Sequence, residues 1–219
     1  MNIKKFKNRL FGRTRGRSNK KIDILNYKKI LVRFKVEKIN EFKNNILDIG
    51  TGYGETSIYL SKKYSYNTII ACEKYVDGNL NLIKNIENNK IKNIFIHPGN
   101  VHELLDSNKT KRYFELVWIF FPDPWPKKKH FKRRLISFYF LEKINNYIKK
   151  NGEIWIVTDS ISYSKHILQS IYQAKKFYKW INQNELHMDL KDYCDLETKF
   201  YKKAIISGAK PSLFILKKL

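Results

Sequence analysis

The stretch Asp48-Ile49-Gly50-Thr51-Gly52-Tyr53-Gly54-Glu55 decides the fold class of this 219-residue chain. It follows a short apolar run, 46–49, and it opens a segment, 55–63, whose apolar residues have helical spacing. Glycines at every second position allow a sharp turn between a strand and a helix and let a ligand approach the backbone closely. The stretch therefore predicts a strand–loop–helix unit with a ligand site in its loop.

Apolar runs and helical patterns alternate on both sides of this stretch. Strands are predicted at 46–49, 68–72, 94–96, 116–121 and 154–158, and helices at 22–39, 55–63, 77–88, 133–149 and 161–175. A last strand is expected at 212–216, with 200–206 as a candidate partner strand. Such alternation is typical of βαβ units around a parallel sheet. Since no repeat or linker interrupts residues 40–219, we expect a single domain at 22–219 after a basic, flexible arm at 1–21.

Charge points to a polyanionic partner. The chain has 44 Lys and Arg against 20 Asp and Glu, a net charge of +24, and each neutralised phosphate releases counterions and adds affinity. Two segments are especially basic, the arm 1–21 and the run 127–134. The excess of lysine could instead reflect the overall composition, since the chain is rich in Lys, Asn and Ile throughout. For the arm, the alternatives to an RNA-binding segment are a solvated tail or a transit peptide.

Other patterns exclude several classes of protein. No apolar stretch approaches the roughly 18 residues of a membrane-spanning helix, and the basic N-terminal segment lacks the apolar core of a secretory signal. Cys72 and Cys194 lie far apart, which argues against a disulfide framework and a zinc site, and the five histidines have no ligand spacing. We therefore expect a cytoplasmic protein without membrane or metal partners.

The acids at the predicted strand ends suggest which cofactor binds. Glu55 occupies the position where a dinucleotide fingerprint needs a small residue beside the pyrophosphate, so a carboxylate there disfavours NAD. Asp48 and Glu73 suit S-adenosylmethionine, which is cationic and has no phosphate, and Glu73 is placed to hold ribose hydroxyls. Asn100, after the third strand, is a candidate partner for the adenine amino group. This pattern resembles the class I methyltransferases.

A second motif narrows the resemblance to one family. Residues 121–135, Phe-Pro-Asp-Pro-Trp-Pro-Lys-Lys-Lys-His-Phe-Lys-Arg-Arg-Leu, resemble the signature of bacterial tRNA (guanine-N7-)-methyltransferases, and the resemblance extends over about residues 40–219. It implies a Rossmann-like class I methyltransferase fold: a mostly parallel central sheet, helices on both faces and an antiparallel C-terminal strand. It also implies methylation of guanosine 46, in the variable loop of tRNA, by S-adenosylmethionine.

The resemblance also implies roles for individual residues. Positions that match cofactor contacts are Asp48, Gly50, Gly52, Glu73, Asn100 and Asp123. Positions that match the substrate site are Lys127, Asp159, Thr198, Lys199, Phe200 and Tyr201, and those that match an RNA-contacting segment are Lys129, His130, Lys132, Arg133 and Arg134. The chain departs from the family pattern at three places, with Asp48 for Glu, Asn100 for Asp and Tyr201 for Glu.

The chemistry of guanine suggests how two of the carboxylates act. Because N7 has a free lone pair at neutral pH, it needs no general base, and catalysis should be mostly alignment. A carboxylate that accepts from N1–H and the exocyclic amino group would leave N7 free. We assign that role to Asp159 and place Asp123, the expected catalytic residue, nearer the cofactor and the reacting centre.

The alternative functions are a methyltransferase acting on another RNA or a protein, a non-catalytic RNA-binding scaffold and an NAD-dependent oxidoreductase. The enzyme is expected to be a monomer or a homodimer.

Overall fold

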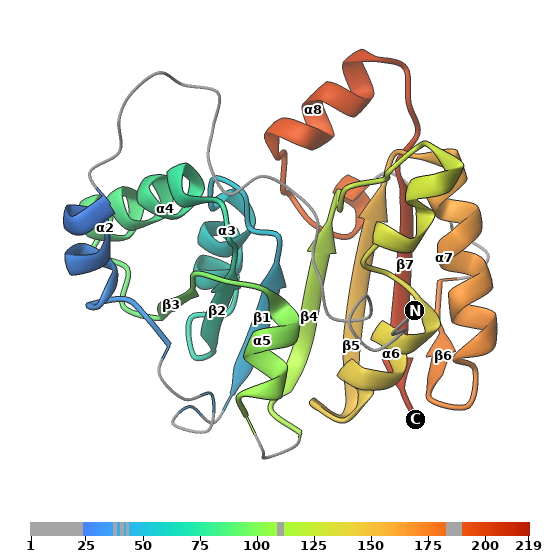
Figure 1. Cartoon of the computed structure of the whole chain (residues 1–219), viewed down its shortest axis with the longest axis horizontal. Coiled ribbons are helices and arrows are strands. Elements are labelled where there is room, and N and C mark those ends of the chain that lie inside the picture. Colours follow the sequence, from blue (N-terminus) through green and yellow to red (C-terminus); the bar gives the residue numbers. More distant parts are fainter. Residues whose placement is uncertain (1–23, 37–38, 40–41, 43, 109–111, 183–189) are drawn as a thin grey trace. The chain divides into compact units, whose positions relative to one another are not determined.

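The computed structural model describes residues 24–36, 39, 42, 44–108, 112–182 and 190–219 (Figure 1). These residues form two compact units, which we call the N-terminal unit (described residues up to 108) and the C-terminal unit (described residues from 112). The predicted basic arm, 1–21, lies outside the described residues. Among the helices of the described segments, none has the length and apolar character needed to cross a membrane.

The N-terminal unit is built on parallel strands in the order β3-β2-β1. Strands β1 (Asn45–Ile49), β2 (Thr68–Cys72) and β3 (Ile94–His97) are joined through helices α3 (Glu55–Lys63) and α4 (Val76–Asn88), with α2 (Ile24–Leu31) before them and α5 (Val101–Asp106) after them. All five residues of β1 are buried, which is typical of a strand in a parallel sheet. Ile49 pairs with Cys72 and Cys72 with His97, so the carboxyl ends of the strands meet at one edge.

The C-terminal unit continues the alternation and ends in an antiparallel strand. Its strand order is β4-β5-β7-β6, from β4 (Phe114–Phe120), β5 (Ile148–Thr158), β7 (Ser212–Lys218) and β6 (Tyr178–Trp180). Strand β4 is parallel to β5, whereas β7 runs antiparallel to β5 and β6, which confirms the predicted antiparallel C-terminal strand. The remaining elements are α6 (Phe138–Asn145), α7 (Ile161–Gln173), α8 (Lys199–Ile206) and the 3₁₀ helices η2 (Lys128–Arg133) and η3 (Leu190–Asp192).

Three predicted elements differ from the structure. The segment 200–206 is not a partner strand but most of helix α8, because its buried residues, Tyr201 and Ala204, lie three positions apart and Thr198 caps the helix. The helix predicted at 133–149 is shorter. Helix α6 begins after its N-cap, Ser137, and the last residues of the predicted range belong to β5. The helix predicted at 22–39 is also shorter, because α2 ends at Leu31 and Lys35 forms an isolated parallel β-bridge with Ile96; residues 22–23 and 37–38 lie outside the described ones.

Candidate active site

The glycine loop between β1 and α3 has the geometry that its sequence predicts. Gly50, Gly52 and Gly54 have φ values of 78°, 58° and 93°, a region that costs other residues about 1–2 kcal/mol. A Cβ added to Gly50 would meet no heavy atom within 4 Å, so open space lies beside this part of the loop. The loop therefore combines a tight turn with backbone that a ligand can approach.

Asp48 is buried next to the glycine loop and fixes it through hydrogen bonds. Its side chain is 1% exposed, and its Oδ2 accepts hydrogen bonds from the hydroxyls of Thr51 (3.0 Å), Thr56 (2.5 Å) and Ser57 (2.6 Å). Burial raises the pKa of the Asp48 carboxyl, and the three hydroxyl donors oppose that shift. Asp48 thus ties the end of β1 to the loop and to the first turn of α3. The three hydroxyl partners were missed in the sequence, although Thr56 and Ser57 directly follow the loop.

Glu73, at the end of β2, is oriented by backbone donors from two segments. Its Oε2 accepts from the N–H of Gly52 (3.0 Å), and its Oε1 accepts from the N–H of Tyr75 (2.8 Å). Each carboxylate oxygen has capacity for a further hydrogen bond. The hydroxyl of Tyr75 lies 3.0 Å from that of Tyr53 in the glycine loop, so a second contact joins the two segments. Glu73 is therefore fixed beside the loop and can still accept from ribose hydroxyls.

Asn100 follows β3 and caps helix α5. Its Oδ1 accepts from the N–H of His102 at 2.8 Å, while Glu103 accepts from the N–H of Asn100 at 3.2 Å, a reciprocal capping box. This gives the amide a structural role that the sequence did not reveal. The Asn100 side chain also accepts from the backbone N–H of Glu103 in this capping box, and its expected contact with an adenine amino group stays a prediction.

These residues of the N-terminal unit fit S-adenosylmethionine better than a dinucleotide. Asp48, Glu73 and Asn100 stand at the carboxyl ends of adjacent parallel strands, where ligands bind in such sheets. Gly50 is open to a ligand, and Glu73 is a fixed acceptor for hydroxyls. Glu55 is exposed in the first turn of α3, where a carboxylate would repel a pyrophosphate.

The loop after β4 presents Asp123 from strained backbone. Phe121 and Trp125 have φ values of 50° and 43°, a region that non-glycine residues rarely adopt and that concentrates at functional sites. Asp123 lies between them and is exposed, with Pro122 and Pro124 on either side. This arrangement restricts the backbone around the carboxylate and leaves its side chain accessible.

The basic segment after this loop packs against Trp125. Within η2, the His130 ring meets the Trp125 ring edge to face at 5.8 Å, and the Arg133 guanidinium lies 4.9 Å from the centre of the Trp125 ring. The side chains of Lys127, Lys129 and Lys132 are exposed. Arg134 differs from the rest of the segment, because it is 5% exposed and its guanidinium donates to neutral oxygens of the protein.

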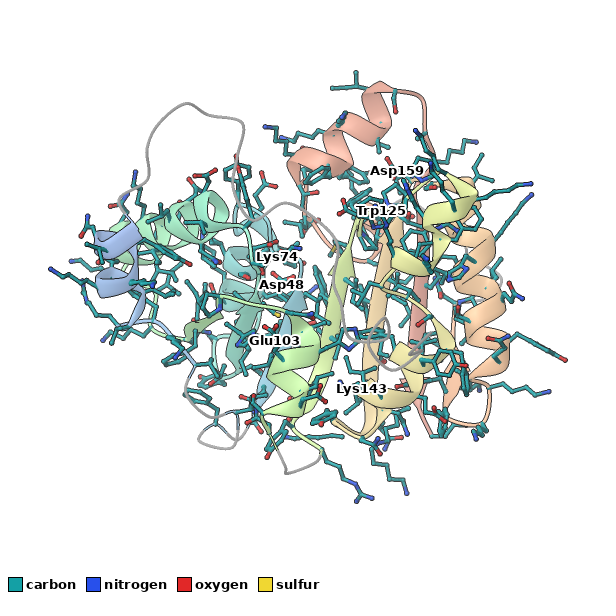
Figure 2. All side chains as sticks on the ribbon, viewed as in Figure 1. Asp48, Lys74, Glu103, Trp125, Lys143 and Asp159 are labelled. Carbon is teal, nitrogen blue, oxygen red and sulfur yellow. The ribbon has the colours of Figure 1, made fainter. Side chains whose placement is uncertain are left out.

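The other predicted substrate residues lie in the same unit. Asp159 is exposed directly after β5, and Figure 2 shows it at the same end of the unit as Trp125. Thr198 is buried and caps α8 by accepting from the N–H of Tyr201 at 3.1 Å, and Tyr201 is itself 5% exposed. Lys199 and Phe200 are exposed, and the Phe200 ring lies 6.4 Å from that of Phe121. Of this stretch, Lys199 and Phe200 are the accessible side chains.

The structure thus gathers the predicted site residues into two groups. Asp48, Gly50, Gly52, Glu73 and Asn100 belong to the N-terminal unit, and Asp123, Lys127, Asp159 and the segments 129–134 and 198–201 belong to the C-terminal unit. Phe121 was missed as a candidate because the sequence does not reveal its contact with Phe200. In the described part of the chain, no three His, Cys, Asp or Glu side chains gather as a metal site.

Solved structures with a similar fold define the class. The chain aligns with an rRNA methylase from Streptococcus thermophilus at a TM-score of 0.55 and 11% identity, covering 92% of this chain and 99% of that one. It aligns with geranyl diphosphate C-methyltransferase from Streptomyces coelicolor A3(2), solved with S-adenosyl-L-homocysteine, at a TM-score of 0.54 and 11% identity, covering 89% and 78%. The predicted class I methyltransferase fold is confirmed.

Sequence comparison identifies the family within that class. The profile of a family described as "Putative methyltransferase" matches residues 43–211. The chain is 35% identical over 184 residues to the tRNA (guanine-N(7)-)-methyltransferase of Wolbachia pipientis wMel, covering 79% of this chain and 80% of the relative. The enzyme of the same name from Buchnera aphidicola subsp. Schizaphis graminum is 34% identical over 196 residues, covering 85% and 81%. The chain belongs to the tRNA (guanine-N(7)-)-methyltransferase family, whose members are S-adenosylmethionine-dependent enzymes.

Proposed function

We propose that this chain transfers the methyl group of S-adenosylmethionine to N7 of guanosine 46, in the variable loop of tRNA. The observation that carries the proposal is the exposed carboxylate of Asp123, held on strained, proline-flanked backbone immediately before a basic helical turn. A fixed anion beside a polycationic segment suits a reaction in which RNA is gripped by its phosphates and one base becomes positively charged.

The N-terminal unit would bind the methyl donor. Glu73 would accept from the ribose hydroxyls, Asn100 from the adenine amino group, and the open backbone at Gly50 and Gly52 would face the cofactor. Asp48 would support this site through the hydroxyls that it binds, since its side chain is buried under the loop. When bound, S-adenosylmethionine supplies an electrophilic methyl group on a sulfonium.

The carboxylates of the C-terminal unit would select and stabilise the base. Asp159 would accept from guanine N1–H and the exocyclic amino group, which leaves N7 unobstructed. Asp123 would lie near the reacting centre, where its charge favours the cationic N7-methylated ring. Alignment of the two reactants would supply most of the remaining acceleration, up to roughly 7–11 kcal/mol in well-oriented systems.

Recognition of the RNA would depend mainly on charge and stacking. Lys127, Lys129, His130, Lys132 and Arg133 would contact phosphates that flank the target, and Lys199 would add a further positive charge. The Phe200 ring is exposed beside Phe121 and offers a face on which the unstacked base could lie. Thr198 and Tyr201 are buried, so their contribution would be to hold α8 and Phe200 in place.

The deciding experiment is methyl transfer from labelled S-adenosylmethionine to total tRNA, followed by nucleoside analysis. We expect label in N7-methylguanosine and a loss of at least about 10²-fold in turnover for Asp123→Asn, the size typical of removing one electrostatic contact to a transition state. Binding of tRNA should stay within a factor of about three, because the phosphate contacts remain. Asp106→Asn, at the exposed end of α5, is the control and should match the wild type.

Three outcomes would contradict parts of the proposal. Label in another nucleoside would indicate a methyltransferase with a different RNA target. Binding of tRNA without any cofactor binding would favour a non-catalytic scaffold. A parallel collapse of tRNA affinity in Asp123→Asn would show that Asp123 binds the substrate and does not act at the reacting centre.

The proposal also includes a single domain at 22–219, a cytoplasmic location and a monomeric or homodimeric state.

A further inference from the structure

We propose that Arg134 is a positioning residue that holds the Asp123 loop against the start of α7, and that it does not contact RNA. This inference rests on the proposed function, because the loop matters for the reaction only if Asp123 does. It separates Arg134 from Lys127, Lys129 and Lys132 in the same basic run, whose side chains are exposed.

Three hydrogen bonds connect the Arg134 guanidinium to two distant segments. Its Nε donates to the carbonyl of Pro124 at 2.8 Å, its Nη1 to the carbonyl of Ser162 at 3.0 Å, and its Nη2 to the Ser162 hydroxyl at 2.9 Å. Pro124 directly follows Asp123, and Ser162 lies in the first turn of α7, three residues after Asp159. One planar group therefore links the loop that carries Asp123 to the first turn of α7, which begins two residues after Asp159.

Aromatic rings enclose the same guanidinium on its faces. Its Cζ lies 3.7 Å from the centre of the Phe131 ring and 5.0 Å from that of Tyr163, and the residue is only 5% exposed. A buried cation is costly unless it is paired or hydrogen-bonded, and here three hydrogen bonds to neutral oxygens and two aromatic rings stabilise the guanidinium. Because the residue is buried to this degree, little of its charged surface is accessible to a phosphate. Lys would keep the charge but not the fork geometry or the stacking.

The loop that Arg134 contacts needs an external support. Phe121 and Trp125 both have positive φ, and such residues persist only where the surrounding structure determines their conformation. The Pro124 carbonyl belongs to the peptide bond directly before Trp125, so the bond from Nε acts next to one of the two strained residues. Without it, the backbone at Asp123 would relax toward ordinary φ values, and the carboxylate would move.

The test compares Arg134→Lys and Ser162→Ala with the surface control Lys132→Ala, in the full-length protein. We expect Arg134→Lys to lower the single-turnover methylation rate at saturating tRNA by about 10²-fold, the size of the effect of misplacing a catalytic group by 1 Å. Ser162→Ala, which removes one acceptor from an exposed position, should lower it only about 3- to 10-fold, because two of the three guanidinium hydrogen bonds remain. Added guanidinium should partly restore the turnover of Arg134→Ala and should not affect Lys132→Ala.

Salt dependence separates positioning from RNA contact. For Arg134→Lys and Ser162→Ala, the slope of log affinity for tRNA against log salt should equal that of the wild type, whereas Lys132→Ala should reduce it by roughly 0.7–0.9. A slope reduced by that amount in Arg134→Ala, with an unchanged rate at saturating tRNA, would overturn the inference. So would wild-type rates in both Arg134→Lys and Ser162→Ala.

Hydrogen–deuterium exchange keeps this inference distinct from the proposed function. Exchange in residues 121–126 should accelerate in Arg134→Lys even if the wild-type chain methylates no tRNA, and unchanged exchange would overturn the positioning role. A wild-type chain that is inactive, with faster exchange in the variant, would refute the proposed function while leaving the contact of Arg134 with the loop intact.

Discussion

Replacing Gly78 by Ala sets two physical effects against each other. Gly78 lies in the first turn of α4, where Ala is favoured over Gly by about 1 kcal/mol of helix propensity. However, a Cβ at this position would be 2.0 Å from the carbonyl oxygen and 2.9 Å from the carbonyl carbon of Gly52 in the glycine loop. These are backbone atoms, so no side chain can rotate to relieve the contact.

The steric effect should exceed the propensity effect. Since Cβ atoms do not come closer than 3.0 Å to other heavy atoms, the helix and the loop must separate by about 1 Å. Overpacking of this kind costs about 1–3 kcal/mol. The shift would also strain the bond from Gly52 N–H to Glu73, and a hydrogen bond to a charged group is worth about 1.5–3 kcal/mol. After subtracting the gain in propensity of about 1 kcal/mol, we expect a loss of roughly 1.5–5 kcal/mol in the free energy of unfolding.

The assays are urea denaturation for stability and calorimetric titration of S-adenosylmethionine for binding. Affinity should fall at least about tenfold, equivalent to 1.4 kcal/mol, because Glu73 and the loop move. Gly208→Ala is the matched control. It forces Ala to a φ of 74° with no heavy atom within 4 Å of its Cβ, so it should cost only about 1–2 kcal/mol and leave cofactor binding unchanged. A Gly78→Ala protein about 1 kcal/mol more stable than the wild type, with normal affinity, would refute the reasoning.

Three further predictions concern the other parts of the site. Thr198→Ala removes the N-cap of α8 and should cost about 1 kcal/mol in urea denaturation, while Thr198→Ser should retain the cap; equal stabilities of all three proteins would contradict this. Changing Lys129, Lys132 and Arg133 together to Ala should reduce the salt slope of tRNA binding by roughly two to three, and an unchanged slope would place the electrostatic contacts elsewhere. Burial lowers the pKa of His97 below its usual 6.5, so the folded state binds fewer protons than the unfolded one, and stability should fall as the pH drops from 6.5 through the lowered pKa. His97→Gln should lose that part of the pH dependence, measured by denaturation at a series of pH values.

Local patterns predicted most of the fold. The helix expected at 55–63 coincides with α3, and the strand at 68–72 with β2, because buried apolar runs and helical spacing express the burial of each element directly. The segment 200–206 was misinterpreted because its apolar residues are compatible with either period, and only burial of Tyr201 and Ala204 selects the helix. The short elements α5 and β6 gave no pattern long enough to detect.

The candidate site was predictable as a set of positions but not as a set of contacts. Asp48, Glu73 and Asp123 stand out in the sequence because each lies at or just after the end of a predicted strand and because glycines or prolines lie next to two of them. The sequence did not indicate that Asp48 is covered by three hydroxyls, nor that Arg134 is enclosed. Both facts depend on which side chains come into contact when the chain folds.

The sequence by itself determined most of the order of strands and helices, the glycine loop, the acids at the strand ends and membership of the methyltransferase family, since these depend on residues close together along the chain. Only the tertiary structure decided which members of a motif are accessible. Arg134 and Lys132 are indistinguishable as basic residues of one run, yet Ser162, 28 positions away, makes Arg134 a buried contact. Burial and partnership arise where distant segments pack, because desolvation depends on every neighbouring atom and not on neighbours in sequence.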